Sequence, residues 1–145
     1  MAIDLTKVLL RLRKEWATAN LFDNDRVHWD GRDFEIPGSG NPWLREVFDV
    51  QDETNVANDL NESTGLYDLS VFSESNRGSK PLYERGQLVA ERFPYPNHLL
   101  LVDPETAFEH RLNIDKVYRQ RITGPTPAWI GMRIGIVWRI YAPTS

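Results

Sequence analysis

The clearest element of the chain is a run of alternating apolar residues near its carboxyl end. Six consecutive even positions are apolar, and the odd positions between them include glycine and arginine. The six are Ile130, Met132, Ile134, Ile136, Trp138 and Ile140. Because successive side chains of a strand point to opposite faces, this pattern predicts a long strand with one buried face.

Shorter runs of the same kind predict further strands. Residues 43–50, 66–72 and 99–102 are rich in apolar and β-branched side chains, and residues 111–122 alternate more weakly. We expect the last of these to pair with the carboxyl-terminal strand through a turn at residues 123–128. That pairing would gather five bases in one neighbourhood, with the register deciding the face of each. They are Lys116, Arg119, Arg121, Arg133 and Arg139.

The Asp30-Gly31 pair predicts a hairpin within residues 26–36. An Asp-Gly pair between alternating segments is a strong short-range hairpin signal. A two-residue turn there would place Val27 opposite Phe34, His28 opposite Asp33 and Arg26 opposite Glu35.

Helical spacing of apolar residues occurs twice. Residues 4–17 carry such a stripe after Asp4, a good N-cap, and end in bases that suit the negative end of a helix dipole. The basic face of this helix is expected to be solvated. A second helix should follow Ser79, with Pro81 in its first turn and Pro94 and Pro96 beyond its end. Its expected buried stripe is Leu82, Leu88, Val89 and Phe93.

The order of these elements predicts an α+β fold with a mixed, largely antiparallel sheet and two main helices packed on it. A chain of 145 residues fits one domain, residues 1–145. Residues 51–63 are polar and acidic with little periodicity, so we expect a mobile acidic loop there. No stretch approaches the roughly 20 apolar residues that a membrane helix needs, and we expect no membrane association.

The net charge of −4 is distributed unevenly along the chain. Residues 21–63 hold eleven acids and three bases, whereas the segments before and after each carry a net charge of +2. The simplest interpretation is a solvated region. The alternative is a surface that repels an anion or pairs with a basic neighbour.

Candidate chemistry is sparse. The absence of cysteine excludes disulfides and thiolate chemistry, and His28, His98 and His110 have no metal-ligand spacing. Residues 23–25 begin like a calcium loop, but Val27 fills a ligand position. Residues 77–80 resemble an anion-binding helix start without the upstream glycine of a P-loop. We therefore predict no catalytic, cofactor-binding or metal site, and no enzyme activity.

Two segments resemble the tail terminator proteins of long-tailed phages. Residues 65–72 read Gly-Leu-Tyr-Asp-Leu-Ser-Val-Phe, and residues 78–93 run from Gly-Ser-Lys-Pro-Leu-Tyr-Glu-Arg to Glu-Arg-Phe. The family has a strand, a glycine-containing loop and a helix ending in phenylalanine, followed by a short strand and a closing pair of strands. The amino-terminal helix, the 29–37 segment and the closing strand at 129–141 match this order. The resemblance covers nearly the whole chain except the acidic segment 51–63.

The resemblance implies a structural role in the virion. Members of this family form a hexameric ring on the head-proximal end of the tail tube. They stop tube polymerisation and present a surface to the head-completion protein, while DNA passes through the lumen without sequence-specific binding. The implied location is the virion tail, after assembly in the host cytoplasm.

Segregated charge suits a ring, in which one patch of a subunit meets a different patch of the next. We expect contacts with other copies, the tube protein or the head-completion protein from acids in the 51–63 segment and from bases further on. These residues are Asp52, Glu53, Asp59, Glu62, Arg77, Lys80, Arg119, Arg121, Arg133 and Arg139. Two alternatives stay open: another neck, head–tail joining or tail-completion protein, and a small ligand-binding module or enzyme.

Overall fold

The computed structural model describes residues 4–93, 95, 97–102 and 109–143. Within these residues, six strands form one sheet in the order β1-β2-β3-β6-β5-β4, with two helices on one of its faces. All neighbouring strands are antiparallel except β1 and β2. The predicted α+β fold with a mixed, largely antiparallel sheet is therefore confirmed.

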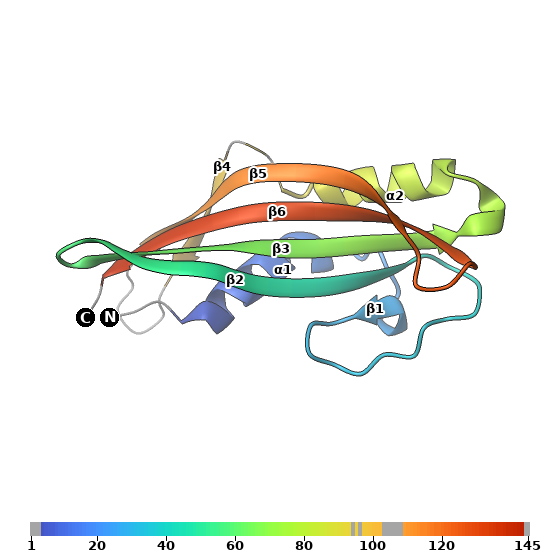
Figure 1. Ribbon diagram of the computed structural model, residues 1–145, viewed down its shortest axis with the longest axis horizontal. Helices are drawn as coiled ribbons and strands as arrows, with labels where there is room; N and C mark the ends of the chain where they lie inside the picture. Colours follow the sequence, from blue (N-terminus) through green and yellow to red (C-terminus); the bar gives the residue numbers. More distant parts are fainter. Residues whose placement is uncertain (1–3, 94, 96, 103–108, 144–145) are drawn as a thin grey trace.

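Four long strands set the shape of the molecule (Figure 1). They are β2 (Trp43–Ala57), β3 (Leu60–Glu74), β5 (Glu109–Thr123) and β6 (Trp129–Pro143), each of 15 residues. A strand of that length spans roughly 50 Å. The tip of the β2–β3 hairpin marks one end of the long axis, and α2 and the β5–β6 turn lie toward the other (Figure 1).

The main core lies between the sheet and its two helices. Helix α1 (Leu5–Ala17) buries Val8, Leu12 and Trp16, and α2 (Lys80–Ala90) buries Leu82 and Val89. They pack on the alternating residues of the sheet that face them. From β3 and β6 these are Tyr67, Leu69, Val71, Met132, Ile134, Ile136, Trp138 and Ile140. The period-two pattern of the last strand thus identified the central strand of the core.

Both helices begin where the sequence predicts. Asp4 caps α1, with its Oδ1 accepting a hydrogen bond from the Thr6 amide at 2.9 Å. Ser79 precedes α2, but its side chain makes no capping hydrogen bond. Leu88 was expected in the buried stripe of α2 and is 45% exposed, so that part of the prediction is wrong. Gly86 is buried there instead, against the Met132 sulfur.

The predicted hairpin over residues 26–36 does not form. Strand β1 (Val27–His28) pairs in parallel with β2, placing Val27 opposite Leu44. Residues 29–42 then pass around the edge of the sheet. On the helix side Trp29 stacks on Trp16 with ring centroids 5.4 Å apart. On the other side Phe34 stacks on Trp43 at 5.2 Å. Aromatic packing on both faces of the sheet overrides the local preference of Asp30-Gly31 for a hairpin.

The prediction of a loop at residues 51–63 is also wrong. Residues 51–57 continue β2, residues 58–59 make a tight turn, and β3 starts at Leu60. Strand β3 is held on its other side by β6, from Leu60 opposite Pro143 onward. The side chains of residues 51–59 are exposed on both faces, so the segment has no hydrophobic alternation to reveal it.

The strands predicted at residues 99–102 and 111–122 form, and each is longer than predicted. Strand β4 (Asn97–Val102) buries Leu99 and Leu101, and β5 buries Leu112 and Ile114. A 3-10 turn, Ser75–Arg77, joins β3 to α2, and a second, Asn24–Arg26, precedes β1. The described residues form one layered unit around a single main core.

Candidate functional site

The end of the β2–β3 hairpin projects as an acidic arm, which we define as residues 49–57 and 60–64. Every side chain from 51 to 59 is exposed. Its paired strands carry the carboxylates of Asp49, Asp52, Glu53 and Glu62, and Asp59 lies in the turn that joins them. The side-chain hydrogen bonds described within the arm join residues close in sequence, such as Asn55 and Asn61 at 3.2 Å. The arm is therefore ordered as strand without a hydrophobic core of its own.

No base compensates the arm from within the hairpin. Residues 46–76 hold eight acids and no lysine or arginine. The nearest guanidinium across the ladder is on β6, where Arg139 lies opposite Thr64. Arg139 is engaged by Asp115 at 3.1 Å and by the Tyr141 hydroxyl at 2.9 Å. The arm thus presents a negative field to whatever approaches the end of the sheet.

The face of the sheet opposite the helices carries both charged and apolar side chains. Cross-strand register orders it into rows that run from β2 through β3 and β6 to β5. One row reads Asp49, Leu66, Val137 and Lys116, and the next reads Val47, Asp68, Gly135 and Tyr118. Acids therefore stand toward the β2 edge of this open face, and Lys116 stands on the β5 side.

One end of the open face is covered. Trp43, Phe72 and Trp129 form a second buried cluster there, with Phe34 and Ile122 packed against it. The Trp129 indole N–H donates to the Pro37 carbonyl at 2.7 Å, which ties the 29–42 segment over this cluster. The uncovered part of the face therefore begins beyond the cluster and runs toward the arm.

The five bases expected in one neighbourhood divide between the two faces. Arg133 lies on the open face, where its Nε and Nη2 donate to Asp68 at 2.8 and 2.6 Å. The hydrogen bond to Asp68 raises the pKa of Arg133. Arg139 and Lys116 share this face through their register with β3 and β6. Arg119 and Arg121 point to the helix side, because they lie opposite the buried Ile134 and Met132.

Arg121 joins the bases at the start of α2. Its guanidinium contacts the Ser79 hydroxyl at 3.4 Å and lies 6.0 Å from the Tyr83 ring centroid. Lys80 and Arg77 are largely exposed there, paired at 3.7 Å with Glu84 and at 4.0 Å with Glu74. The predicted contact residues thus form three groups: the acids of the arm, the bases beside α2 and the arginines of the open face.

A buried polar network under α1 was not predicted from the sequence. The Glu46 side chain is fully buried and accepts from Arg13 Nε at 2.9 Å, Arg13 Nη2 at 2.5 Å and the Tyr67 hydroxyl at 2.5 Å. Burial, followed by the adjacent Glu46 charge, raises the pKa of Tyr67 well above its usual value. The available signal was Glu46 itself, an acid between Leu44 and Phe48 on the core-facing positions of β2. The network fastens α1 to the sheet.

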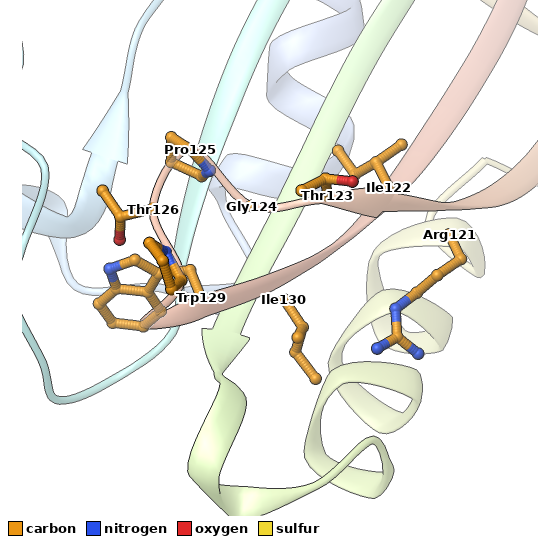
Figure 2. Close-up of a pocket in the computed structure, with 9 residues that line it drawn as sticks. Arg121, Ile122, Thr123, Gly124, Pro125, Thr126, Trp129 and Ile130 are labelled. Atoms are coloured by element: carbon orange, nitrogen blue, oxygen red, sulfur yellow. The ribbon is translucent and has the colours of Figure 1, made fainter.

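A cleft lies beside the β5–β6 turn (Figure 2). It encloses about 670 Å³ and is lined by residues 121–127 with Trp129 and Ile130. Figure 2 shows Arg121 on the α2 side of this cleft and Trp129 on the other. Its lining holds no carboxylate or histidine that would work with the threonine hydroxyls as a base.

The described residues show no grouping of metal-binding side chains. In this part of the chain no three His, Cys, Asp or Glu side chains come together in a way that could hold a metal ion. Of the histidines, His28 stacks on Phe34 at 5.1 Å, His98 is exposed on β4 and His110 is buried on β5. Among the helices of the described residues, none has the length and hydropathy required to cross a bilayer.

Comparisons with known proteins establish the fold and go no further. No family model matches the chain, and no curated protein matches its sequence. A solved structure whose name is only a sequence identifier, without a functional description, superimposes with a TM-score of 0.67. The match covers 96% of each chain at 16% sequence identity. The same architecture therefore exists in a distant sequence of nearly the same extent.

Proposed function

We propose that this protein is a structural subunit that assembles with copies of itself into a ring, and that the ring is a phage tail terminator. It would cap the head-proximal end of a tail tube, stop tube polymerisation and provide the surface for head attachment. The observation that carries the proposal is the acidic arm. Its residues are paired as strand although the side chains of residues 51–59 have no core to bury them.

An ordered, exposed hairpin whose charged residues are all acidic is suited to binding another protein surface. The exposed side chains of residues 51–59 bury little apolar surface, so this extension of the ladder brings little stability to the fold, although β6 pairs with β3 from Leu60 onward. The arm and the bases beside α2 lie on different elements, which supports contact between unlike patches of identical copies. Such contacts generate rings when the rotation between copies closes.

The charge of the arm also fits a passage for DNA. Binding to the phosphate backbone depends on lysine and arginine, which residues 46–76 lack entirely. A collar whose lumen carried the acidic arms would let DNA slide without holding it. The resemblance to tail terminators indicates that the partner is a tail tube, and the arm is the surface proposed to make contact.

Microscopy of tail tubes tests the proposal. Tubes polymerised from purified tube protein should acquire a stacked cap at one end and stop lengthening when this protein is added. A variant in which Asn-Gly replaces residues 54–62, joining the cross-strand neighbours Glu53 and Ser63, should keep the circular dichroism of the parent but cap poorly. The exchange Lys14→Glu with Glu91→Lys, at two exposed residues outside the contact groups, is a matched control for altered surface charge.

The same preparation distinguishes the main alternative. Tube ends that stay bare while the protein binds isolated capsid portals would identify it as a head–tail connector. Tubes that continue to lengthen, with neither ends nor portals occupied, would contradict a role at the head–tail junction.

A further inference from the structure

The sheet has two free strand edges, one on each side. On the outer edge of β2, strand β1 pairs only with Leu44 and Arg45. On the outer edge of β5, β4 pairs from Glu109 to Ile114. Within the described residues, no backbone hydrogen bond joins the outer edge of residues 47–57 or of residues 116–123 to another segment. Each edge therefore offers a row of unpaired amides and carbonyls.

The two free edges carry opposite charge. Residues 49–56 on β2 contain Asp49, Asp52 and Glu53 and no base. Residues 116–123 on β5 contain Lys116, Arg119 and Arg121 and no acid. All six side chains are exposed. An edge of this kind attracts the other one and repels a copy of itself.

The charges also agree in the face that each occupies. Glu53 lies opposite Ser63, which pairs with the buried Ile140, so Glu53 shares the helix side with Arg119 and Arg121. Where residues 49–56 run antiparallel to residues 116–123 of the next copy, Glu53 comes opposite Arg119 on the helix side. Asp49 and Lys116 lie on the open face at opposite ends of this overlap.

Strand direction permits this neighbour. Strands β2, β3, β6 and β5 alternate in direction across the sheet. A second copy in the same orientation would set its β2 antiparallel to the β5 of the first. Strand addition of this kind supplies main-chain hydrogen bonds, while the side chains supply specificity.

A stagger between copies makes the two edges fully accessible. If two copies lie side by side without a shift along the strands, Asp49 of one copy is at the height of Lys116 of the other. In that arrangement β4 of one copy and β1 of the next lie between the two edges, so that β2 and β5 cannot pair over their free residues. Sliding one copy along the strands brings residues 49–56 against residues 116–123 and clears both obstructions. Closing sheets around an axis requires tilted strands and such a shear.

Both edges are also protected from indiscriminate pairing. The β2 ladder carries irregularities between Val50 and Asp52 and between Asn55 and Ala57, and β5 has one between Ile114 and Lys116. Charges and bulges are the devices by which natural edge strands avoid aggregation. Each of these edges can still pair with an edge that has the opposite charge and a matching twist.

We propose that the outer edge of β2 in one copy, at residues 49–56, pairs antiparallel with the outer edge of β5 in the next copy, at residues 116–123. The sheets of neighbouring copies become continuous through this contact. The inference rests on the proposed function, because a ring of identical copies is what joins the two edges. To that proposal it adds the two edges that meet, the identity of the partner as a second copy, and the antiparallel direction in which the strands pair.

Charge reversal tests the pairing, with assembly followed by light scattering. The arm variant Asp52→Lys with Glu53→Lys places bases on both edges, and the edge variant Arg119→Glu with Arg121→Glu places acids on both. Each alone should associate at least about 100-fold more weakly than the parent, since like charges then face each other. Mixed in equal amounts, the two variants should assemble again, because each arm then meets an opposite edge. The exchange Lys14→Glu with Glu91→Lys, at two exposed residues outside the contact groups, should assemble like the parent.

Site-specific crosslinking tests the same contact without relying on affinity. The chain has no cysteine, so introduced thiols have no background partner. A mixture of Glu53→Cys and Arg119→Cys chains should form a disulfide-linked heterodimer under oxidation well above the yield of a Glu53→Cys and Lys14→Cys mixture, since Lys14 is exposed on α1 away from both edges. Equal yields from the two mixtures, or no recovery of assembly in the charge-reversed mixture, would overturn the inference.

The outcomes separate this inference from the proposed function. Crosslinks between the two edges in a protein that leaves tail tubes uncapped would retain the edge pairing and refute the terminator. Capped tubes without preferential crosslinks or charge rescue would retain the terminator and refute the edge pairing.

Discussion

The carboxylate of Glu46 lies against the guanidinium of Arg13, with both contacts at 2.9 Å or less, although the two residues come from β2 and α1. Their side chains differ in exposure: that of Glu46 is fully buried and that of Arg13 is 26% exposed. A buried carboxylate is tolerated only when it is paired and hydrogen-bonded. The pair, completed by Tyr67 and the Asp30 amide, therefore fixes the position of α1 on the sheet.

Removing the buried carboxylate should destabilise the fold. We expect Glu46→Leu to lower the free energy of unfolding by about 2–3 kcal/mol, because it leaves Arg13 and the Tyr67 hydroxyl without their acceptor. Urea denaturation measures the change. Asp68→Asn, which weakens the more exposed pair with Arg133, should cost under about 1 kcal/mol. Equal losses in the two variants would contradict this account of α1.

Tyr67 should make stability fall at high pH. Its pKa is raised by burial and by Glu46, so the folded state keeps the proton above pH 10, where the unfolded state begins to lose it. The contribution is complete below about pH 10 and declines by about 1.4 kcal/mol per pH unit above it. The difference in unfolding free energy between the parent and Tyr67→Phe should therefore shrink from pH 10 upward. Parallel profiles would show that Tyr67 ionises normally in the folded protein.

Gly65 should tolerate no side chain. A Cβ there would collide with the Asp49 carbonyl and the Trp138 ring, which are fixed by the ladder and the core. We expect Gly65→Ala to cost about 2–3 kcal/mol by overpacking. Gly38 has nothing within 4 Å of a built Cβ, so Gly38→Ala is the matched control and should be neutral or slightly stabilising. Thermal unfolding of the two variants distinguishes packing from a general effect of removing glycine.

Phe34 should hold the 29–42 segment over the open face. Phe34→Ala removes the ring that stacks on Trp43, so we expect a loss of about 1–2 kcal/mol and faster proteolytic cleavage within residues 30–42. Ile36 is 42% exposed, and Ile36→Ala should leave the cleavage rate near that of the parent. A Phe34→Ala protein as resistant to protease as the parent would show that the Trp129–Pro37 hydrogen bond suffices.

The sequence predicted best those elements that have one buried face. Ile134, Ile136 and Trp138 made β6 predictable, because every second residue of this strand is apolar and faces the core. The arm was missed for the same reason, since a strand exposed on both faces has no alternation to display. The 26–36 segment was misassigned because its turn chemistry is local, whereas the stacking of Trp29 on Trp16 and of Phe34 on Trp43 is tertiary.

The candidate contact residues were only partly predictable. The acids Asp52, Glu53, Asp59 and Glu62 do share one end of the sheet, because they adjoin in sequence on a hairpin, but the register places Glu53 on the helix side and Asp52 on the open face. The distribution of Arg119 and Arg133 on opposite faces depends on the β5–β6 register, which charge counting cannot supply. The complementarity of the two free edges became visible only once the strand order β1-β2-β3-β6-β5-β4 placed them on opposite sides of the sheet.

The central claim is that this chain acts by closing a ring with identical copies, and its mass in solution tests that claim most directly. Light scattering of the protein, alone and with purified tail tubes, should give one closed species with a fixed whole number of copies. That species should dissociate as added salt screens the edge charges. A protein that remains a single copy at millimolar concentration, both alone and beside tubes, would contradict the account.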